Sequence, residues 1–149
     1  MRVVLQRVAR AAVSWRDEVG REQREEIARG LVILLGVGPD DDTQKADRLA
    51  DKVANLRLFA DDQGRTNLSL KDIEGEVLIV SQFTLYADTS RGRRPSWVAA
   101  APGDVAEPLV EAVADQLRKH GATVATGVFG AEMEVELVND GPVTIFLEV

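Results

Sequence analysis

The 149-residue chain contains no cysteine and a single histidine, His120. Without thiols the protein can form no disulfide, no thiolate zinc site and no cysteine nucleophile. A single histidine also removes most other metal sites. Because His120 falls where a helix is expected to end, and the helix dipole favours a cation there, we interpret it as a surface residue. That interpretation leaves no histidine for a Ser-His-Asp triad.

Long apolar segments are absent as well. The longest runs from Leu31 to Val37, far short of the roughly 20 residues that are needed to cross a bilayer. The apolar stretch that follows Met1 is too short for a signal peptide. With 45% hydrophobic and 29% charged residues, the composition is typical of a globular domain. We therefore expect a soluble cytoplasmic protein, without membrane contact, that folds as a single domain over residues 1–149.

Acidic residues outnumber basic ones by 25 to 18, which gives a formal net charge of −7. This balance argues against broad nucleic-acid binding, which depends on lysine and arginine neutralising phosphates. Basic residues are nevertheless grouped in two places, the first 16 residues and a segment near position 92: Arg2, Arg7, Arg10 and Arg16, and then Arg91, Arg93 and Arg94. These groups are consistent either with a mixed solvated surface or with local anchoring of the end of a polyanion.

The pattern of apolar residues predicts strands at 2–8, 11–15 and 31–35, and another at 77–80 that continues to residue 85. One helix is expected after a cap at Asp42 or Thr43, and a second from near 105–107, with Pro108 in its first turn and Gly121 after its end. Alternation over 132–137 and 143–149 predicts two strands joined by a turn at 139–142. The order predicts an α/β fold, in which a mixed sheet curls toward a barrel with two helices packed on it.

Two segments stand out from this framework. Ser81-Gln82-Phe83-Thr84 places polar side chains at the end of an apolar strand, where an unpaired buried polar group costs about 1–3 kcal/mol. These residues are either groups of an active site or hydroxyls bonded to nearby backbone. Gly141-Pro142 combines a glycine, which adopts conformations closed to other residues, with an X-Pro bond that can be cis. On pattern alone, an ordinary hairpin turn is the simpler interpretation of this pair.

Together these segments resemble the bacterial-type D-aminoacyl-tRNA deacylase family, whose members carry a Ser-Gln-Phe-Thr motif and a C-terminal Gly-cis-Pro motif. The matching segments follow the expected order from end to end: residues 1–8, 34–41, 55–59, 67–70, 81–97 and 126–144. The resemblance implies a barrel-like mixed-sheet fold, a homodimer with the active site at its interface, and no metal or organic cofactor. It also implies a carboxylic ester hydrolase that releases D-amino acids, and glycine, from the 3′-terminal ribose of tRNA.

The resemblance also assigns roles to the two motifs. Gly141 and Pro142 are expected to reach into the partner's pocket and crowd the side where an L side chain would lie. Arg7 is expected to hold that loop, with a salt bridge or a phosphate contact as its alternative role. Ser81 and Thr84 are expected to position the α-amino group or the water. Because no base is available to activate Thr84, we expect attack by water assisted by the ribose 2′-hydroxyl, with backbone groups of Gln82 and Phe83 as oxyanion donors.

The aminoacyl-adenosine end of the tRNA is expected to contact two further side chains. Phe129 resembles the family's aromatic that stacks on the terminal adenine, although a core phenylalanine is the generic alternative. Met133 is expected to line the pocket near the amino acid. Two other functions stay open at this point: a general esterase or amidase for small metabolites, and a non-enzymatic module that binds and protects charged tRNA ends.

Overall fold

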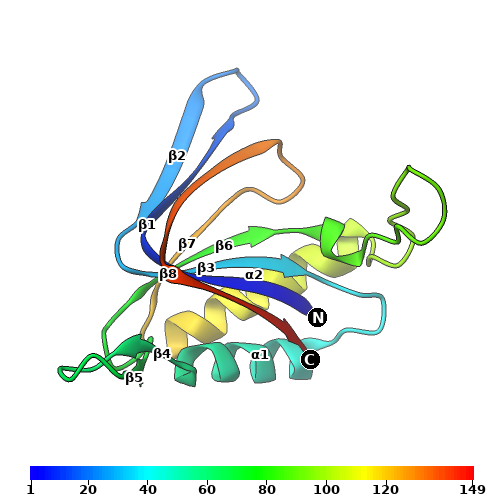
Figure 1. The fold of residues 1–149 in the computed structure, drawn as a ribbon. Helices are drawn as coiled ribbons and strands as arrows, with labels where there is room; N and C mark the ends of the chain where they lie inside the picture. Colours follow the sequence, from blue (N-terminus) through cyan, green and yellow to red (C-terminus); the bar gives the residue numbers. More distant parts are fainter.

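The computed structural model describes all residues from Met1 to Val149. Eight strands, two α-helices and one 3-10 helix follow one another along the chain (Figure 1). Their bounds are β1 Arg2–Arg16, β2 Glu22–Ile27, β3 Gly30–Gly36, α1 Thr43–Asn55, β4 Arg57–Ala60, β5 Thr66–Ser69, β6 Glu76–Ser81, η1 Phe83–Tyr86, α2 Gly103–Lys119, β7 Thr123–Thr126 and β8 Met133–Glu148.

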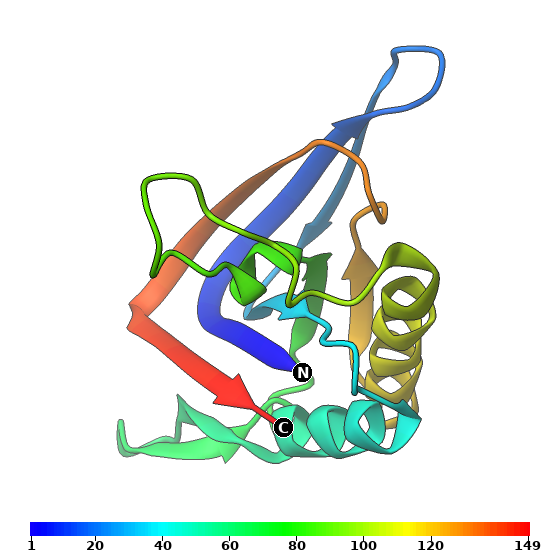
Figure 2. The ribbon, with the colours of Figure 1, turned by 90° about the vertical axis from the view of Figure 1, so that its right-hand side faces the viewer.

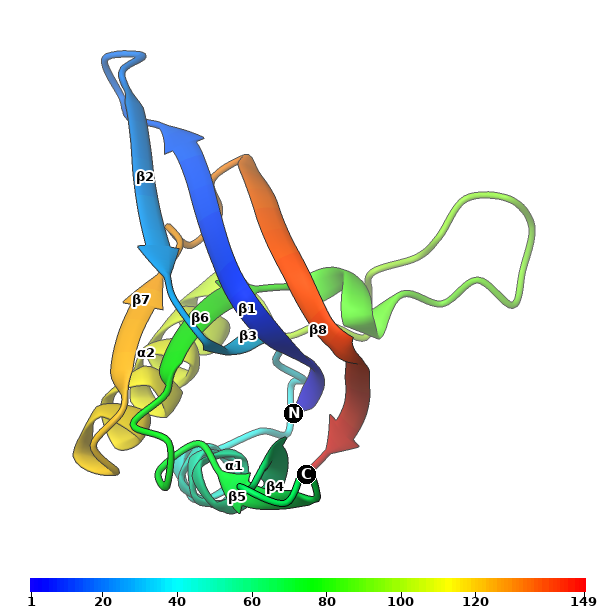
Figure 3. The same ribbon diagram turned by 60° about the vertical axis from the view of Figure 1, so that its left-hand side comes forward.

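Strand β1 organises the main sheet. One of its edges pairs with β3 in the first half and with β2 in the second half, while β8 pairs with the opposite edge, all antiparallel. Beyond β3, the strands β6 and β7 continue the sheet in parallel. The sheet is strongly curved (Figure 3), and β4 and β5 form a separate antiparallel pair. The predicted α/β fold, a mixed barrel-like sheet with two helices, is confirmed.

The two helices cover one face of the sheet (Figure 2). In α1 the stripe Ala46, Leu49, Ala50 and Val53 is fully buried, and Asp42 caps the helix by accepting from the Lys45 N–H at 2.8 Å. Helix α2 buries Leu109, Val113 and Leu117 against the same core, and Gly121 follows its end with φ +94°. Neither helix combines the length and the apolar character that a membrane span requires.

The opposite face of the sheet carries a second, smaller apolar cluster, which no helix covers: Val8, Ala11, Val13, Ile27, Val32, Leu78 and Val80. Trp15, Leu34 and Leu137 border this cluster and are only partly buried. Strand β8 adds exposed apolar side chains beyond it, with 37% of Val135, 38% of Val138 and 56% of Phe146 accessible. The sheet therefore presents one covered face and one open face.

Four predicted elements differ from the structure. The separation of the expected strands 2–8 and 11–15 is wrong, because β1 is continuous: its pairing with β8 shifts register there, and its other partner changes from β3 to β2. The segment after Ser81 is a 3-10 helix and not a continued strand. Helix α2 begins at Gly103, so Pro108 lies beyond its first turn. Pro108 has no N–H to donate to the Asp104 carbonyl. Because Asp104 is exposed, water can donate to that carbonyl instead.

The fourth difference concerns the C-terminal third. The predicted turn at 139–142 is wrong, since β8 is one strand that stays paired with β1 on both sides of these residues. Asn139 pairs with Val8 and Thr144 with Gln6, so residues 140–143 loop out of the ladder as a bulge. We call this segment the Gly141 bulge. The strands β2, β4, β5 and β7 have no counterpart among the predicted elements.

Candidate active site

The segment after β6 turns sharply at the edge of the sheet. The Gln82 N–H donates to the Leu35 carbonyl at 2.8 Å, which continues the β3–β6 pairing by one residue. The chain then enters η1, where the Leu85 N–H donates to the Gln82 carbonyl at 3.2 Å. The Gln82 N–H, one of the two expected oxyanion donors, is thus already engaged in the sheet. The Phe83 N–H, which opens η1, is in the position where helical N–H groups lack an acceptor within the helix.

The side chains of this segment do not bond to nearby backbone. The Gln82 amide Nε2 donates to the Thr84 hydroxyl, and the half-buried Ser81 hydroxyl makes no hydrogen bond within the chain. No carboxylate or imidazole contacts Thr84, and an amide N–H cannot accept a proton. The arrangement leaves Thr84 without a general base and Ser81 free to bind another molecule.

Ser81, Gln82 and Phe83 line a cavity of about 270 Å³, which we call the Ser81 cavity. Its other walls come from β3, from the start of α2 and from the segment that leads into β8: Leu35, Val37, Ala101, Gly103, Ala106, Val110, Phe129, Gly130, Ala131 and Met133. A second cavity of about 350 Å³ shares Ser81, Val110 and Phe129 with it. The structure thus brings together five of the predicted site residues, Ser81, Gln82, Phe83, Phe129 and Met133.

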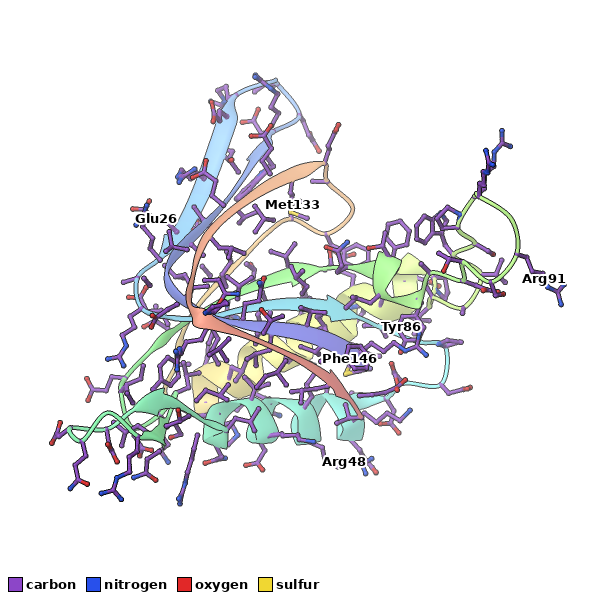
Figure 4. The ribbon with its side chains drawn as sticks, viewed as in Figure 1. Glu26, Arg48, Tyr86, Arg91, Met133 and Phe146 are labelled. Atoms are coloured by element: carbon purple, nitrogen blue, oxygen red, sulfur yellow. The ribbon has the colours of Figure 1, made fainter.

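Phe129 and Met133 reach the cavity by close packing of the loop before β8. Phe129 is half-buried, packs against the main core and also borders both cavities, so its ring contacts the core on one side and faces the cavities on the other. Met133 lies at the start of β8 (Figure 4). A Cβ on Gly127 would lie 2.5 Å from the Met133 sulfur, so the Met133 side chain packs directly over this glycine.

A buried charged cluster lies behind η1. The Asp41 carboxylate, with 4% of its side chain exposed, accepts from the Met1 ammonium at 2.8 Å and from Lys45 Nζ at 2.9 Å. It also accepts from the Gly38 N–H at 2.7 Å and faces the Tyr86 hydroxyl at 3.4 Å. Burial raises the pKa of Asp41, but the hydrogen bonds from Met1, Gly38 and Lys45 outweigh it, and the net pKa is lowered. Burial, with the nearby Asp41 charge, raises the pKa of Tyr86 to about 12.

This cluster fixes the end of η1 to the N-terminus. The Arg2 guanidinium lies 4.5 Å from the centre of the Tyr86 ring and donates to the Leu85 carbonyl at 3.2 Å. Sequence reasoning missed Asp41 and Tyr86. Asp41 stands in an acidic run that is typical of a solvated turn. The only sequence signal for its burial is the Gly-Val-Gly-Pro segment before it, because glycines let neighbouring segments pack closely against the backbone.

The Gly141 bulge is built differently. The Gly141–Pro142 peptide bond is cis, and Gly141 has φ +131°, a conformation that side-chain-bearing residues rarely adopt. The Asn139 side-chain oxygen accepts from the Val143 N–H at 2.9 Å and closes the bulge. Arg7 donates through Nε to the Asp140 carbonyl at 3.0 Å and through Nη1 to the Leu58 carbonyl at 2.5 Å. It also pairs with the Asp140 carboxylate at 3.6 Å, so it contacts the bulge and forms a salt bridge there.

The bulge and the cavity do not meet within one chain. Gly141 and Pro142 are exposed, and neither they nor Arg7 line the Ser81 cavity. Thr84 lies next to the cavity in sequence but is not among its lining residues. The predicted site residues therefore fall into two groups, one around the Ser81 cavity and one at the Gly141 bulge.

Comparisons with known proteins agree with this architecture. The family model described as D-Tyr-tRNA(Tyr) deacylase matches residues 4–148. A protein of Roseiflexus sp. (strain RS-1), named D-aminoacyl-tRNA deacylase, is 58% identical over 148 residues, which are 99% of this chain and 93% of that protein. A protein of Mycolicibacterium smegmatis with the same name is 55% identical over 149 residues, 100% of both chains.

Two solved structures are also similar. One, titled c-Myc DNA Unwinding Element Binding Protein, has a TM-score of 0.89 at 38% identity and covers 100% of this chain and 99% of that one. The other, titled as a probable eukaryotic D-amino acid tRNA deacylase, has a TM-score of 0.79 at 18% identity over 99% of this chain and 98% of that one, and shows likeness of fold alone. On the family model and the identity of its relatives, the chain belongs to the D-Tyr-tRNA(Tyr) deacylase family.

Proposed function

We propose that the protein hydrolyses the ester bond between a D-amino acid and the 3′-terminal ribose of tRNA, and that it also releases glycine from tRNA. Relatives at 55–58% identity over nearly the whole chain are named for the first activity. The observation that carries the proposal is the Ser81 cavity, which joins polar groups of the Ser-Gln-Phe-Thr segment to the apolar side chains of Phe129 and Met133. Such a cavity suits a small polar ester attached to an aromatic base.

The chemical step in this proposal is attack by water, assisted by the ribose 2′-hydroxyl. The support is the environment of Thr84, whose hydroxyl has the Gln82 amide as its partner and no base to remove its proton. Aminoacyl esters are labile, so positioning and a hydrogen bond to the developing oxyanion suffice for catalysis. The Phe83 N–H is the proposed oxyanion donor, and the Ser81 hydroxyl positions the α-amino group or the water.

The proposed reaction uses no metal or organic cofactor. The residue types support this, because the chain has no cysteine and one histidine from which to build a transition-metal site. Treatment with EDTA is expected to leave the hydrolysis rate unchanged. Loss of activity on chelation, with recovery on adding zinc, would contradict this part of the proposal.

Chirality is proposed to depend on a second copy of the chain. In a homodimer the Gly141 bulge of one copy enters the Ser81 cavity of the other and occupies the space that an L side chain needs. Two observations support this. The bulge is exposed and is held in shape by hydrogen bonds within the chain. The open face of the sheet carries exposed apolar side chains that a second copy would cover. A thousandfold preference for D-substrates requires about 4 kcal/mol, which a rigid clash supplies.

The experiment that tests the activity follows release of labelled tyrosine from D-Tyr-tRNA and L-Tyr-tRNA in parallel. The proposal predicts rapid release from the D-ester and no release above the spontaneous rate from the L-ester. Equal rates on both, together with turnover of simple esters, would indicate a general esterase. Tight binding of both without turnover would indicate a module that protects charged tRNA ends.

A further inference from the structure

The segment between η1 and α2 forms a long loop that projects from the body of the molecule (Figures 1 and 3). Every residue from Asp88 to Ala99 is exposed. The base of the loop is closed by a backbone pair in which Asp88 and Ser96 exchange hydrogen bonds of 2.8 and 2.9 Å. We call residues 88–99 the arginine loop, because Arg91, Arg93 and Arg94 lie in it.

The charge of the arginine loop is opposite to that of the protein. The three arginines share the loop with one acid, Asp88, whose carboxylate accepts from the Ser90 N–H at 2.9 Å. All the ion pairs of the structure lie in other segments, so these three guanidinium groups are unpaired. Arg91 points into solvent at the far end of the loop (Figure 4). Unpaired guanidinium groups are well suited to bind phosphate oxygens in bidentate fashion.

The arginine loop is attached to the rim of the Ser81 cavity through its C-terminal end. Near its C-terminal end, Trp97 packs edge-to-face on Phe83, a cavity residue, with ring centres 5.4 Å apart. Just past the loop, the Ala101 N–H donates to the Val37 carbonyl at 2.9 Å, and both of these residues line the cavity. Phe83 and Trp97 keep 56% and 40% of their surface exposed. A ligand that extends out of the cavity would therefore pass this aromatic pair and meet the three arginines.

We propose that the arginine loop binds the sugar–phosphate backbone of the tRNA acceptor stem while the aminoacyl end occupies the Ser81 cavity. This inference rests on the proposed function, because it takes the substrate of the cavity to be the end of a tRNA. An adenosine bound by its 3′ ester continues through its 5′ phosphate into a chain of phosphates. Contacts to those phosphates position the molecule without reading its sequence and account for local basic charge on an acidic protein.

The test replaces the three arginines together, as Arg91→Ala, Arg93→Ala and Arg94→Ala, and compares two substrates. One is D-Tyr-tRNA, and the other is the 3′ ester of D-tyrosine with adenosine, which has no phosphate. For the triple variant we expect kcat/KM on D-Tyr-tRNA to fall at least tenfold because KM rises. We also expect the slope of log kcat/KM against log salt concentration to become less negative by about 2–3. Hydrolysis of the adenosine ester is expected to stay unchanged.

A matched control removes the same charge elsewhere, as Arg48→Ala, Lys52→Ala and Lys71→Ala. Arg48 and Lys52 belong to α1 and Lys71 follows β5, and all three are exposed; Figure 4 shows Arg48 far from Arg91. We expect this control to keep its activity on D-Tyr-tRNA and its salt dependence. Equal losses in the control and the loop variant would mean that only net charge matters, and would overturn the proposal.

Other outcomes overturn it in distinguishable ways. An equal loss on both substrates would mean that the loop shapes the cavity and does not bind phosphates. A fall in molar mass by light scattering would mean that the loop holds a second copy of the chain. If the unaltered protein hydrolysed neither ester, the proposed function would fail. Binding of uncharged tRNA by the variant and the unaltered protein would then still decide whether the loop binds RNA.

Discussion

The Ser81 cavity and the Gly141 bulge are held by different means, although the family resemblance assigns both to one active site. The cavity is backed by the main core and by the buried cluster of Asp41, Met1 and Tyr86 behind η1. The bulge stands on the exposed part of β8 and is held by hydrogen bonds from Arg7 and within its own residues. One region is a concave site supported by burial, and the other is a convex loop supported by polar contacts.

Under the proposed dimer, this difference explains how each chain carries one part of the site. A cavity must be supported from behind, and α2, β3 and β6 do this within the chain. A loop that enters a cavity must instead be exposed until it meets its target, and no cavity of its own chain is lined by Gly141 or Pro142. In a twofold dimer each copy supplies both parts, so two identical sites form from complementary surfaces.

The bulge is expected to be most sensitive at Gly141. A Cβ there would lie 2.8 Å from Arg7 Nη2 and 3.0 Å from Val143 Cγ2, in a backbone conformation with φ +131°. In the proposed dimer the added methyl group lies where the bulge meets the substrate, so we expect Gly141→Ala to block D-substrates as well. It should reduce kcat/KM for D-Tyr-tRNA about a hundredfold or more, at about 1.4 kcal/mol for each factor of ten. The control is Gly20→Ala, which has φ +79° but open space around it, and which should keep full activity. Unchanged activity in Gly141→Ala would separate the bulge from the reaction.

The cavity side is expected to depend most on Asp41 for its stability. Asp41→Asn leaves the Met1 ammonium and Lys45 without a carboxylate, and breaking such a buried pair costs about 3 kcal/mol. The pKa of Asp41 is lowered on folding from 3.8, so its stabilisation is complete above pH 3.8 and is lost as the pH falls through the folded value. Urea unfolding against pH should therefore show a steeper acid loss for the unaltered protein than for Asp41→Asn. Asp40→Asn, at the exposed neighbouring carboxylate, should behave like the unaltered protein.

Phe129 distinguishes a ligand contact from a core contact. If Phe129 stacks on the terminal adenine, Phe129→Ala should lose about 1–3 kcal/mol of stacking free energy and raise KM by the corresponding factor. Its loss of stability should be smaller than that of Phe59→Ala, which removes a fully buried core ring worth about 3–5 kcal/mol. A large drop in Tm with unchanged KM would instead assign Phe129 to the core.

The smallest effect is expected at Thr84. Removing a covalent nucleophile typically costs far more than about a thousandfold in kcat, whereas Thr84 here only accepts a hydrogen bond from Gln82. We expect Thr84→Ala, and the isosteric Thr84→Val, to lose about tenfold or less in single-turnover experiments. Trapping of an aminoacyl ester on Thr84 would contradict attack by water.

Much of the fold could be predicted from the sequence, because its signals are local. The apolar stripes and the Asp42 cap define α1, and the run from Leu31 to Leu35 defines β3. The continuity of β8 could not be predicted, since Asn139-Asp140-Gly141-Pro142 has the composition of a turn and only pairing with β1 keeps it within one strand. Asp41 was missed because its main partner, the Met1 ammonium, lies 40 residues away in the chain.

The two groups of site residues show the same limit. Ser81-Gln82-Phe83 and Phe129 meet in one cavity, which their separation in sequence does not reveal. The order of residues also does not indicate whether the Gly141 bulge acts in its own chain. That relation depends on the shape of the folded surface and on what packs against it.

The composite site can be tested most directly with two inactive variants that complement each other. The first is Gly103→Trp, because a Cβ at the exposed Gly103 would have Phe129 Cε1 as its nearest neighbour at 3.4 Å, so the indole would fill the Ser81 cavity. The second is Gly141→Ala. Each variant alone should be inactive on D-Tyr-tRNA, yet mixed dimers hold one intact cavity facing one intact bulge. Equal mixing should restore about a quarter of the sites of a twofold dimer. No recovery, although both chains fold and exchange, would contradict a site built from two copies.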